Sequence, residues 1–251
     1  MSVPNPPLIG YHNLLRDPTA SVSASAGNAA WAVDWRLDRA WQPDSDIATL
    51  EATLPSPVTA DYVGLCGHNL GGGSLHLRAW DGSAFAPIVT ITPAGPTCHM
   101  TPFPAVTTDR WQIEVITAGD PAILAVLAVG LALPLDSGLR QGFVPPPFTE
   151  QAEVIDTTSQ EGLPLGRTVR RTPGRLTLNV TDLDAEWMRT HWLPLRRHAR
   201  DLPFFLLWNP TQWPDEAALC WAEGEPSPNA YTQAGYMDGT LRCRALTEVL
   251  T

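Results

Sequence analysis

Apolar and polar residues alternate in several segments of the first half of the chain. Residues 48–54 (ATLEATL) and 74–81 (SLHLRAWD) follow this pattern, and 110–117 (RWQIEVIT) places Trp111 and Ile113 on one face. A period of two residues is that of a β-strand with one buried face. These segments are therefore predicted to be strands that share a core.

Longer apolar runs lie between the alternating segments. Residues 61–69 (DYVGLCGHN) and 85–91 (FAPIVTI) are rich in strand-forming residues, and residues 122–133 contain no polar side chain. The last run is shorter than the roughly 20 residues of a membrane span, so we interpret it as a buried strand and expect no membrane insertion. Turn signals such as LGGGS (70–74) recur at near-regular intervals without a helical period. This spacing predicts a β-sandwich of jelly-roll type.

The pattern changes after residue 133. Residues 134–148 (PLDSGLRQGFVPPPF) contain a triple proline, which suits neither a strand ladder nor a helix. We therefore expect a β-sandwich domain over residues 1–133, a Pro-rich linker over 134–150 and a second, β-rich domain over 151–251.

The second domain is expected to be β-rich with one central helix. Residues 174–180, 203–209 and 239–250 have the apolar or alternating pattern of strands. Between them, four residues recur at steps of four, preceded by two capping residues and interrupted by a proline that should kink or split the helix. The recurring residues are Leu183, Trp187, His191 and Leu195, the caps Thr181 and Asp182, and the proline Pro194.

Composition supports the all-β fold class. The 251 residues include 25 prolines, about twice the usual share, which favours short strands joined by turns. The net charge is −10, and all 16 basic residues are arginine. The part of the chain up to residue 160 is strongly acidic and lacks the basic patch that nucleic-acid binding requires, so we expect no specific nucleic-acid binding.

Motifs for catalysis are absent from the sequence. It has no G-x-S-x-G, H-E-x-x-H or Walker-type motif, and its six histidines do not have metal-ligand spacing. We therefore expect no enzyme and no cofactor. No positively charged leader precedes an apolar stretch at the start, so we expect synthesis in the cytoplasm. The cysteines are then expected to be buried thiols rather than disulfides; they are Cys66, Cys98, Cys220 and Cys243.

Half of the positive charge lies in 34 residues of the second domain. Two interpretations stand side by side: a solvated face, or a surface between subunits where guanidinium groups pair with carboxylates of a neighbour. The residues are Arg167, Arg170, Arg171, Arg175, Arg189, Arg196, Arg197 and Arg200.

Three tryptophans, Trp31, Trp35 and Trp41, lie close together in NAAWAVDWRLDRAWQP (28–43). They could line a helical face, form a sugar-stacking platform or brace the wall of a sandwich.

Four elements in order resemble the discoidin, or galactose-binding-like, module: DWRLDRAW (34–41), DYVGL (61–65), AWDGSAF (79–85) and AVG (128–130). The resemblance covers about residues 15–133 and implies that Trp41 packs in the core. It also implies a calcium position beside this loop, which Asp34 and Asp38 would match. The usual glycine is Trp35 here, so we expect no metal.

The segment GRLTLNVTDLDAEWMRTHWLPL, followed by PFFLLWNP and GYMDGTLRCRAL, is similar in layout to the distal tail proteins of long-tailed bacteriophages. That resemblance implies a structural component of a tail tip or baseplate. Such a component would be made in the host cytoplasm, assemble with copies of itself into a ring and with other tail proteins, and reside in the virion. The alternative is an adhesin that binds host surface glycans through Trp31, Trp35, His68 and Asn69 on the sandwich rim.

Overall fold

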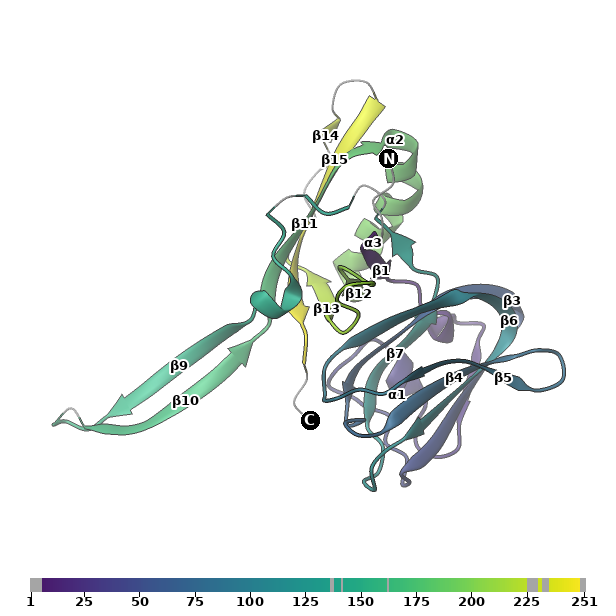
Figure 1. The fold of residues 1–251 in the computed structure, drawn as a ribbon, viewed down its shortest axis with the longest axis horizontal. Coiled ribbons are helices and arrows are strands. Elements are labelled where there is room, and N and C mark those ends of the chain that lie inside the picture. Colours follow the sequence, from purple (N-terminus) through teal and green to yellow (C-terminus); the bar gives the residue numbers. More distant parts are fainter. Residues whose placement is uncertain are drawn as a thin grey trace.

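The computed structural model describes residues 6–135, 138–140, 142–161, 163–224, 230–231 and 235–248. They form a curled β-sandwich, a second antiparallel sheet with a helix on one face, and a β-hairpin that projects away from both (Figure 1). The predicted all-β class with a discoidin-like sandwich and one central helix in the second domain is confirmed. None of the described helices is long and apolar enough to span a membrane.

Two long strands build the sandwich because they take part in both of its layers. In β3 and β6, the register shifts between Thr53 and Val58, where the pair bends. On one side of the bend β6 pairs with β4, and on the other side β3 pairs with β7. The order is β2-β3-β6-β4-β5, with β7 beside β3. The strands are β2 (Ser21–Ala24), β3 (Ile47–His68), β4 (Ser74–Trp80), β5 (Phe85–Ile91), β6 (His99–Ile116) and β7 (Leu124–Gly130).

The sandwich core contains the residues that alternation placed inward. Trp111 and Ile113 are fully buried, as are Leu75 and Leu77. Trp41 is also fully buried, and its indole N–H donates a hydrogen bond to the Ala26 carbonyl over 2.7 Å. Trp41 therefore braces the wall of the sandwich, as its position in the resemblance implied.

The apolar run at 122–133 is explained by β7, which is buried on both faces. Leu127 and Val129 point into the sandwich core, whereas Val126 and Ala128 point into a second apolar cluster toward the other sheet. A strand covered on both sides needs no polar positions.

The second sheet has the order β11-β15-β13-β12-β1-β8. It combines strands from both ends of the chain, since β1 pairs with β12 and with β8. Its strands are β1 (Leu8–Gly10), β8 (Leu133–Pro134), β11 (Gly174–Asp184), β12 (Phe204–Leu207), β13 (Ala217–Ala222) and β15 (Tyr236–Leu246), with β14 (Ala230–Tyr231) beside β15.

The helix that covers this sheet runs through α2 (Ala185–Trp187), a π-helical turn (Met188–Trp192) and α3 (Leu193–Asp201). The expected caps Thr181 and Asp182 are wrong, because β11 continues to Asp184, whose carboxylate accepts the backbone N–H groups of Glu186 and Trp187. The interruption expected at Pro194 takes the form of the π turn, after which the proline lies in the first turn of α3, where its missing N–H costs little.

The apolar cluster that contains Val126 and Ala128 joins the sandwich to the second sheet. Tyr62, Met100 and the Cys66–Cys98 pair come from the sandwich, and Phe205 and Leu219 come from the sheet. The two layers approach so closely at Gly64 that a Cβ there would lie 2.6 Å from the Phe205 ring. The two bodies are therefore packed against one another rather than loosely tethered.

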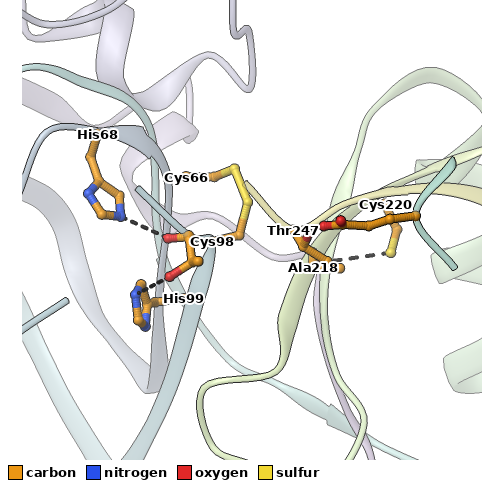
Figure 2. Close-up of a disulfide and its surroundings, with 9 residues drawn as sticks. Cys66, His68, Cys98, His99, Ala218, Cys220 and Thr247 are labelled. Atoms are coloured by element: carbon orange, nitrogen blue, oxygen red, sulfur yellow. Dashed lines mark hydrogen bonds between the residues drawn. A yellow bond between two sulfur atoms is a disulfide. The ribbon is translucent and has the colours of Figure 1, made fainter. Parts of the chain in front are cut away.

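The prediction of four thiols is corrected at this junction. Cys66 and Cys98 form a disulfide, whereas Cys220 and Cys243 are buried thiols. Figure 2 shows the disulfide beside the segment of Thr247, whose carbonyl accepts the backbone N–H of Cys98 over 2.6 Å. The physical reason is register: β3 and β6 place Leu65 opposite His99, which brings the cysteine Cα atoms within 4.3 Å. Spacing along the chain does not reveal that register.

The remaining elements are short helices and the hairpin. They are a 3-10 turn at Leu14–Arg16, α1 (Ala30–Val33), a 3-10 turn at Pro146–Phe148, β9 (Gln151–Thr158) and β10 (Pro164–Thr172). Within the expected linker 134–150, residues 136, 137 and 141 lie outside the described residues.

Candidate functional site

The structure does not bring the four predicted rim residues together as a binding surface. Trp35 is buried in the junction cluster, with its ring 5.6 Å from that of Phe205. His68 is fully buried: its Nε2 lies 2.9 Å from the Thr97 carbonyl and its Nδ1 accepts the Leu70 N–H. The expectation that these two side chains face a ligand is therefore wrong, because the second sheet and the loops cover them.

The other two rim residues differ. The Asn69 side chain donates to the Pro121 carbonyl and accepts from the Ile123 N–H at 2.8 Å each, so it ties two loops together. Trp31, in α1, keeps 41% of its surface exposed and is the one predicted residue with an accessible ring.

Burial also determines the protonation of His68. Because the imidazole is desolvated, its pKa falls to about 4, and the folded protein holds it neutral near pH 7. A buried neutral histidine of this kind stabilises loop geometry.

The carboxylates expected at a calcium position both contact Arg36. Asp34 accepts the backbone N–H of Arg36, and Asp38 lies 3.2 Å from its guanidinium Nε. Among the described residues, no group of three histidine, cysteine, aspartate or glutamate side chains could hold a metal ion.

A groove with an aromatic wall, which sequence reasoning missed, lies at the bend of β3 and β6. Its volume is about 600 Å³, and the half-buried ring of Trp80 forms one wall. The Arg110 guanidinium lies 4.9 Å from the centre of this ring. The Thr108 hydroxyl donates a hydrogen bond to the Trp80 carbonyl over 3.0 Å. Polar side chains of Thr53, Thr107 and Asp109 line the rest. An aromatic face with a carboxylate and hydroxyls beside it can stack on and hydrogen-bond a polar ring.

A second groove, of about 250 Å³, lies where the sandwich meets the second sheet. It is lined by Tyr11, His12, Trp35 and His198, among others. His198 packs edge-on against Tyr11, its Nε2–H donates a hydrogen bond to the Pro203 carbonyl over 2.8 Å, and burial lowers its pKa. These side chains are engaged with one another, so the groove serves the packing of the junction.

The eight predicted interface arginines are divided among three places. Arg167 lies on the hairpin and forms two hydrogen bonds with Asp156, at 2.7 and 3.2 Å. Arg175 lies on β11, 3.4 Å from Glu223. Four lie on the helix run: Arg189, Arg196, Arg197 and Arg200. The side chains of Arg170 and Arg171 lie outside the described residues.

The structure adds two arginines that sequence reasoning did not include. Strand register places Arg244 opposite Arg175 and Arg242 opposite Thr177 on β11. The alternation of Leu241 and Cys243 with the two arginines signalled that they share a face, but only the strand pairing places them beside Arg175.

The hairpin of β9 and β10, called the arm below, carries several exposed apolar side chains. Val154, Ile155, Leu163 and Leu165 are between 47% and 66% exposed. Figure 1 shows the arm standing away from both sheets. A two-stranded hairpin without a covered face is marginally stable in water. Val154 and Ile155 are consecutive in β9, so apolar side chains are exposed on both faces of the arm.

Comparison with known proteins gives matches only among solved structures. No protein-family model matches the sequence. No curated protein matches it either.

Three of the solved structures contain sugars or are named for them. The Clostridium perfringens module CpGH89CBM32-5, solved with GalNAc-β-1,3-galactose, has 15% identity, a TM-score of 0.40, and coverage of 46% of this chain and 98% of its own. Chitosan-binding module 1 from a Paenibacillus sp. IK-5 chitosanase/glucanase has 18% identity, a TM-score of 0.40, and coverage of 47% and 98%.

The third is a Ruminococcus gnavus GH29 fucosidase solved with fucose, with 15% identity and a TM-score of 0.42. The match covers 49% of this chain and spans 27% of the fucosidase.

Proposed function

We propose that this protein is a structural assembly component that joins protein subunits through its arm. The observation that carries the proposal is the exposure of Val154, Ile155, Leu163 and Leu165 on a hairpin that projects from the body. Covering such side chains contributes on the order of 1 kcal/mol each, and the described residues leave them uncovered. A partner protein that packs on the arm would recover this free energy.

In its finer form, the proposal is a ring in the tail tip or baseplate of a long-tailed bacteriophage, with the sandwich domain on the outside. The similarity of residues 174–246 to distal tail proteins supports this form, and an arm that reaches a neighbouring subunit suits a ring. Localisation in the virion and contacts with other tail proteins belong to the same proposal. Immunogold labelling of intact particles tests it, and absence of the protein from tails would overturn it.

The assembly step is tested with purified full-length protein. Val154→Asp combined with Leu165→Asp places two charges on the arm. Gln151→Asp with Thr190→Asp is the matched control, because these two positions are exposed, already polar and not cross-strand neighbours of the four apolar residues. We expect sedimentation velocity to show a concentration-dependent oligomer for wild type and control, and monomer for the apolar-position variant. A wild type that stays monomeric at every concentration, or an apolar-position variant that assembles equally well, would overturn the proposal.

The second candidate function is glycan binding by the sandwich domain. The groove beside Trp80 favours it, because an aromatic wall, a carboxylate and hydroxyls converge there. This groove, rather than the likeness to the sugar-bound structures, is the supporting observation. In this candidate the Trp80 ring stacks on a sugar ring, and the Asp109 carboxylate accepts hydrogen bonds from the hydroxyl groups of the sugar.

A glycan array distinguishes this groove from the rim predicted from sequence. Trp80→Ala should abolish a wild-type signal, whereas Trp31→Ala, which removes an exposed ring elsewhere, should leave it unchanged. Loss of signal only in Trp31→Ala would favour the rim site predicted from sequence over the groove. No wild-type signal on any glycan would count against this function.

A further inference from the structure

One half of one face of the second sheet is not covered by the described chain. The helix packs on the opposite face, against residues such as Leu178, Cys220 and Leu241. On the face in question, the sandwich covers Phe205 and Leu219 of β12 and β13. The neighbouring strands β11 and β15 present exposed polar side chains there: Arg175, Thr177, Arg242 and Arg244.

These side chains form an ordered surface, which we call the arginine face: Arg175, Arg242, Arg244 and Trp221. Strand pairing puts Arg175, Arg244 and Trp221 in one row across three adjacent strands, with Arg242 in the next row. A pocket of about 430 Å³ opens beside them, between Pro173 and Trp221. Pro173 directly follows the arm, so the arginine face begins where the arm ends.

Glu223 is the carboxylate that the structure places at this face. It lies 3.4 Å from Arg175 and 3.5 Å from Arg244, longer than the 2.7–2.9 Å typical of a strong charge-assisted hydrogen bond. Arg175 and Arg244 share this carboxylate, and among the described residues no ion pair involves Arg242, so the face carries net positive charge. It does so in a chain whose net charge is −10.

A surface of opposite charge lies on the sandwich loops. Thr117 holds two of these loops together, because its N–H donates to the Asp46 carbonyl at 2.8 Å and its hydroxyl donates to the Asp120 carbonyl. Asp44, Asp46 and Asp120 are all exposed at this end, which we call the acidic end. Ile47, also exposed, provides an apolar side chain beside them. Within the described residues, no ion pair joins the acidic end to the arginine face.

We propose that the arginine face of one copy binds the acidic end of a second copy. This inference rests on the proposed assembly function and names the surfaces that meet. Carboxylates of the acidic end pair with Arg242 and Arg244, and Ile47 packs at the Pro173–Trp221 pocket. The two surfaces differ, so the contact is head-to-tail, and a head-to-tail contact with a suitable rotation closes into a ring. Guanidinium–carboxylate pairs across it set the orientation of the subunits.

Charge reversal with rescue tests the pairing. Arg242→Glu with Arg244→Glu reverses the arginine face, and Asp44→Arg with Asp46→Arg reverses the acidic end; all four side chains are exposed, so the variants should fold. We expect each reversal to weaken assembly by at least about tenfold, and the protein that carries both reversals to regain assembly to within about threefold of wild type. Arg16→Glu with Arg36→Glu is the matched control, because both side chains are exposed and lie outside the arginine face and the predicted interface arginines, and it should assemble as wild type does.

The outcomes separate this inference from the arm proposal. Either reversal assembling as wild type does, or no recovery in the combined protein, overturns the pairing. If the arm variant stops assembly while the reversals do not, the pairing is wrong and the arm proposal stands. If the reversals stop assembly and the combination restores it while the arm variant has no effect, the pairing stands and the arm proposal is wrong. A wild type that is monomeric at every concentration overturns both.

Discussion

The sandwich and the arm are both antiparallel β-structure, yet they are held in different ways. The sandwich closes around a core that includes Trp41, Trp111 and Leu75, all fully buried. The arm is a single ladder, and its described side-chain pair, Arg167 with Asp156, lies in solvent. An exposed pair of this kind contributes at most about 1 kcal/mol. The difference shows that strand pairing alone does not make a stable body: the described chain covers the apolar residues of the sandwich and leaves those of the arm exposed.

The largest effect is expected at the junction between the two sheets. Phe205→Ala removes a fully buried ring and should lower the free energy of unfolding by about 3–5 kcal/mol. Phe148→Ala, near the base of the arm, removes a ring that is 75% exposed and should change it by less than about 0.5 kcal/mol. Urea unfolding of both variants measures the difference. Equal losses would contradict the contrast between covered and uncovered regions.

Reduction of the Cys66–Cys98 disulfide is expected to have the next largest effect. The bond closes a loop with a sequence separation of 32, and removing it should cost about 3.7 kcal/mol through the entropy of the unfolded chain. Urea unfolding with and without a reductant measures this cost. The Cys66→Ser, Cys98→Ser protein is the control, and its stability should not respond to reductant. If wild type does not respond either, the disulfide adds nothing to the junction.

The pH dependence of stability should reflect buried His68. Its pKa is about 4 in the folded protein and near 6.5 when unfolded, so the unfolded state binds more protons between these values. Stability should therefore fall as the pH drops through this window, by about 2 kcal/mol between pH 7 and pH 5. His99 and His198, whose pKa values burial also lowers, act in the same direction. Urea unfolding of His68→Gln should show a shallower slope, and an unchanged slope would exclude His68 as its source.

The smallest effect is expected from removal of the arm. Replacing residues 151–172 with a short Gly-Ser turn should change the free energy of unfolding by less than about 1 kcal/mol, because the arm adds no covered core. The same protein should fail to assemble. A loss of several kcal/mol would show that the arm stabilises the body, and would remove the contrast between the two regions.

Alternation in the sequence was sufficient to find much of the fold. Strands with one buried face, such as the one that carries Trp111, alternate apolar and polar residues with a period of two, whatever they pack against. The apolar run at 122–133 predicted a buried strand for a different reason, because a strand covered on both faces needs no polar positions. The arm gave no such signal: residues of a strand without a covered face have no reason to alternate.

Less of the candidate site could be predicted. Trp35 and His68 have the residue types of a binding rim, but the second sheet and nearby loops bury them. The arginine content of the second domain can be read from the sequence. That Arg175 and Arg244 are cross-strand neighbours depends on strand register. The Trp80 groove depends on the bend of two long strands, which no local motif marks.

The sequence by itself determined the all-β class and the central helix, because these follow from local periodicity and the cost of exposing apolar side chains. The buried position of Trp41 was implied only by the resemblance to the discoidin module. Tertiary structure alone decided which cysteines bond, which aromatic rings reach solvent and which arginines share a face. Those features depend on contacts between residues far apart in the chain, and strand register, which sets many of them, is chosen by the packing of whole sheets.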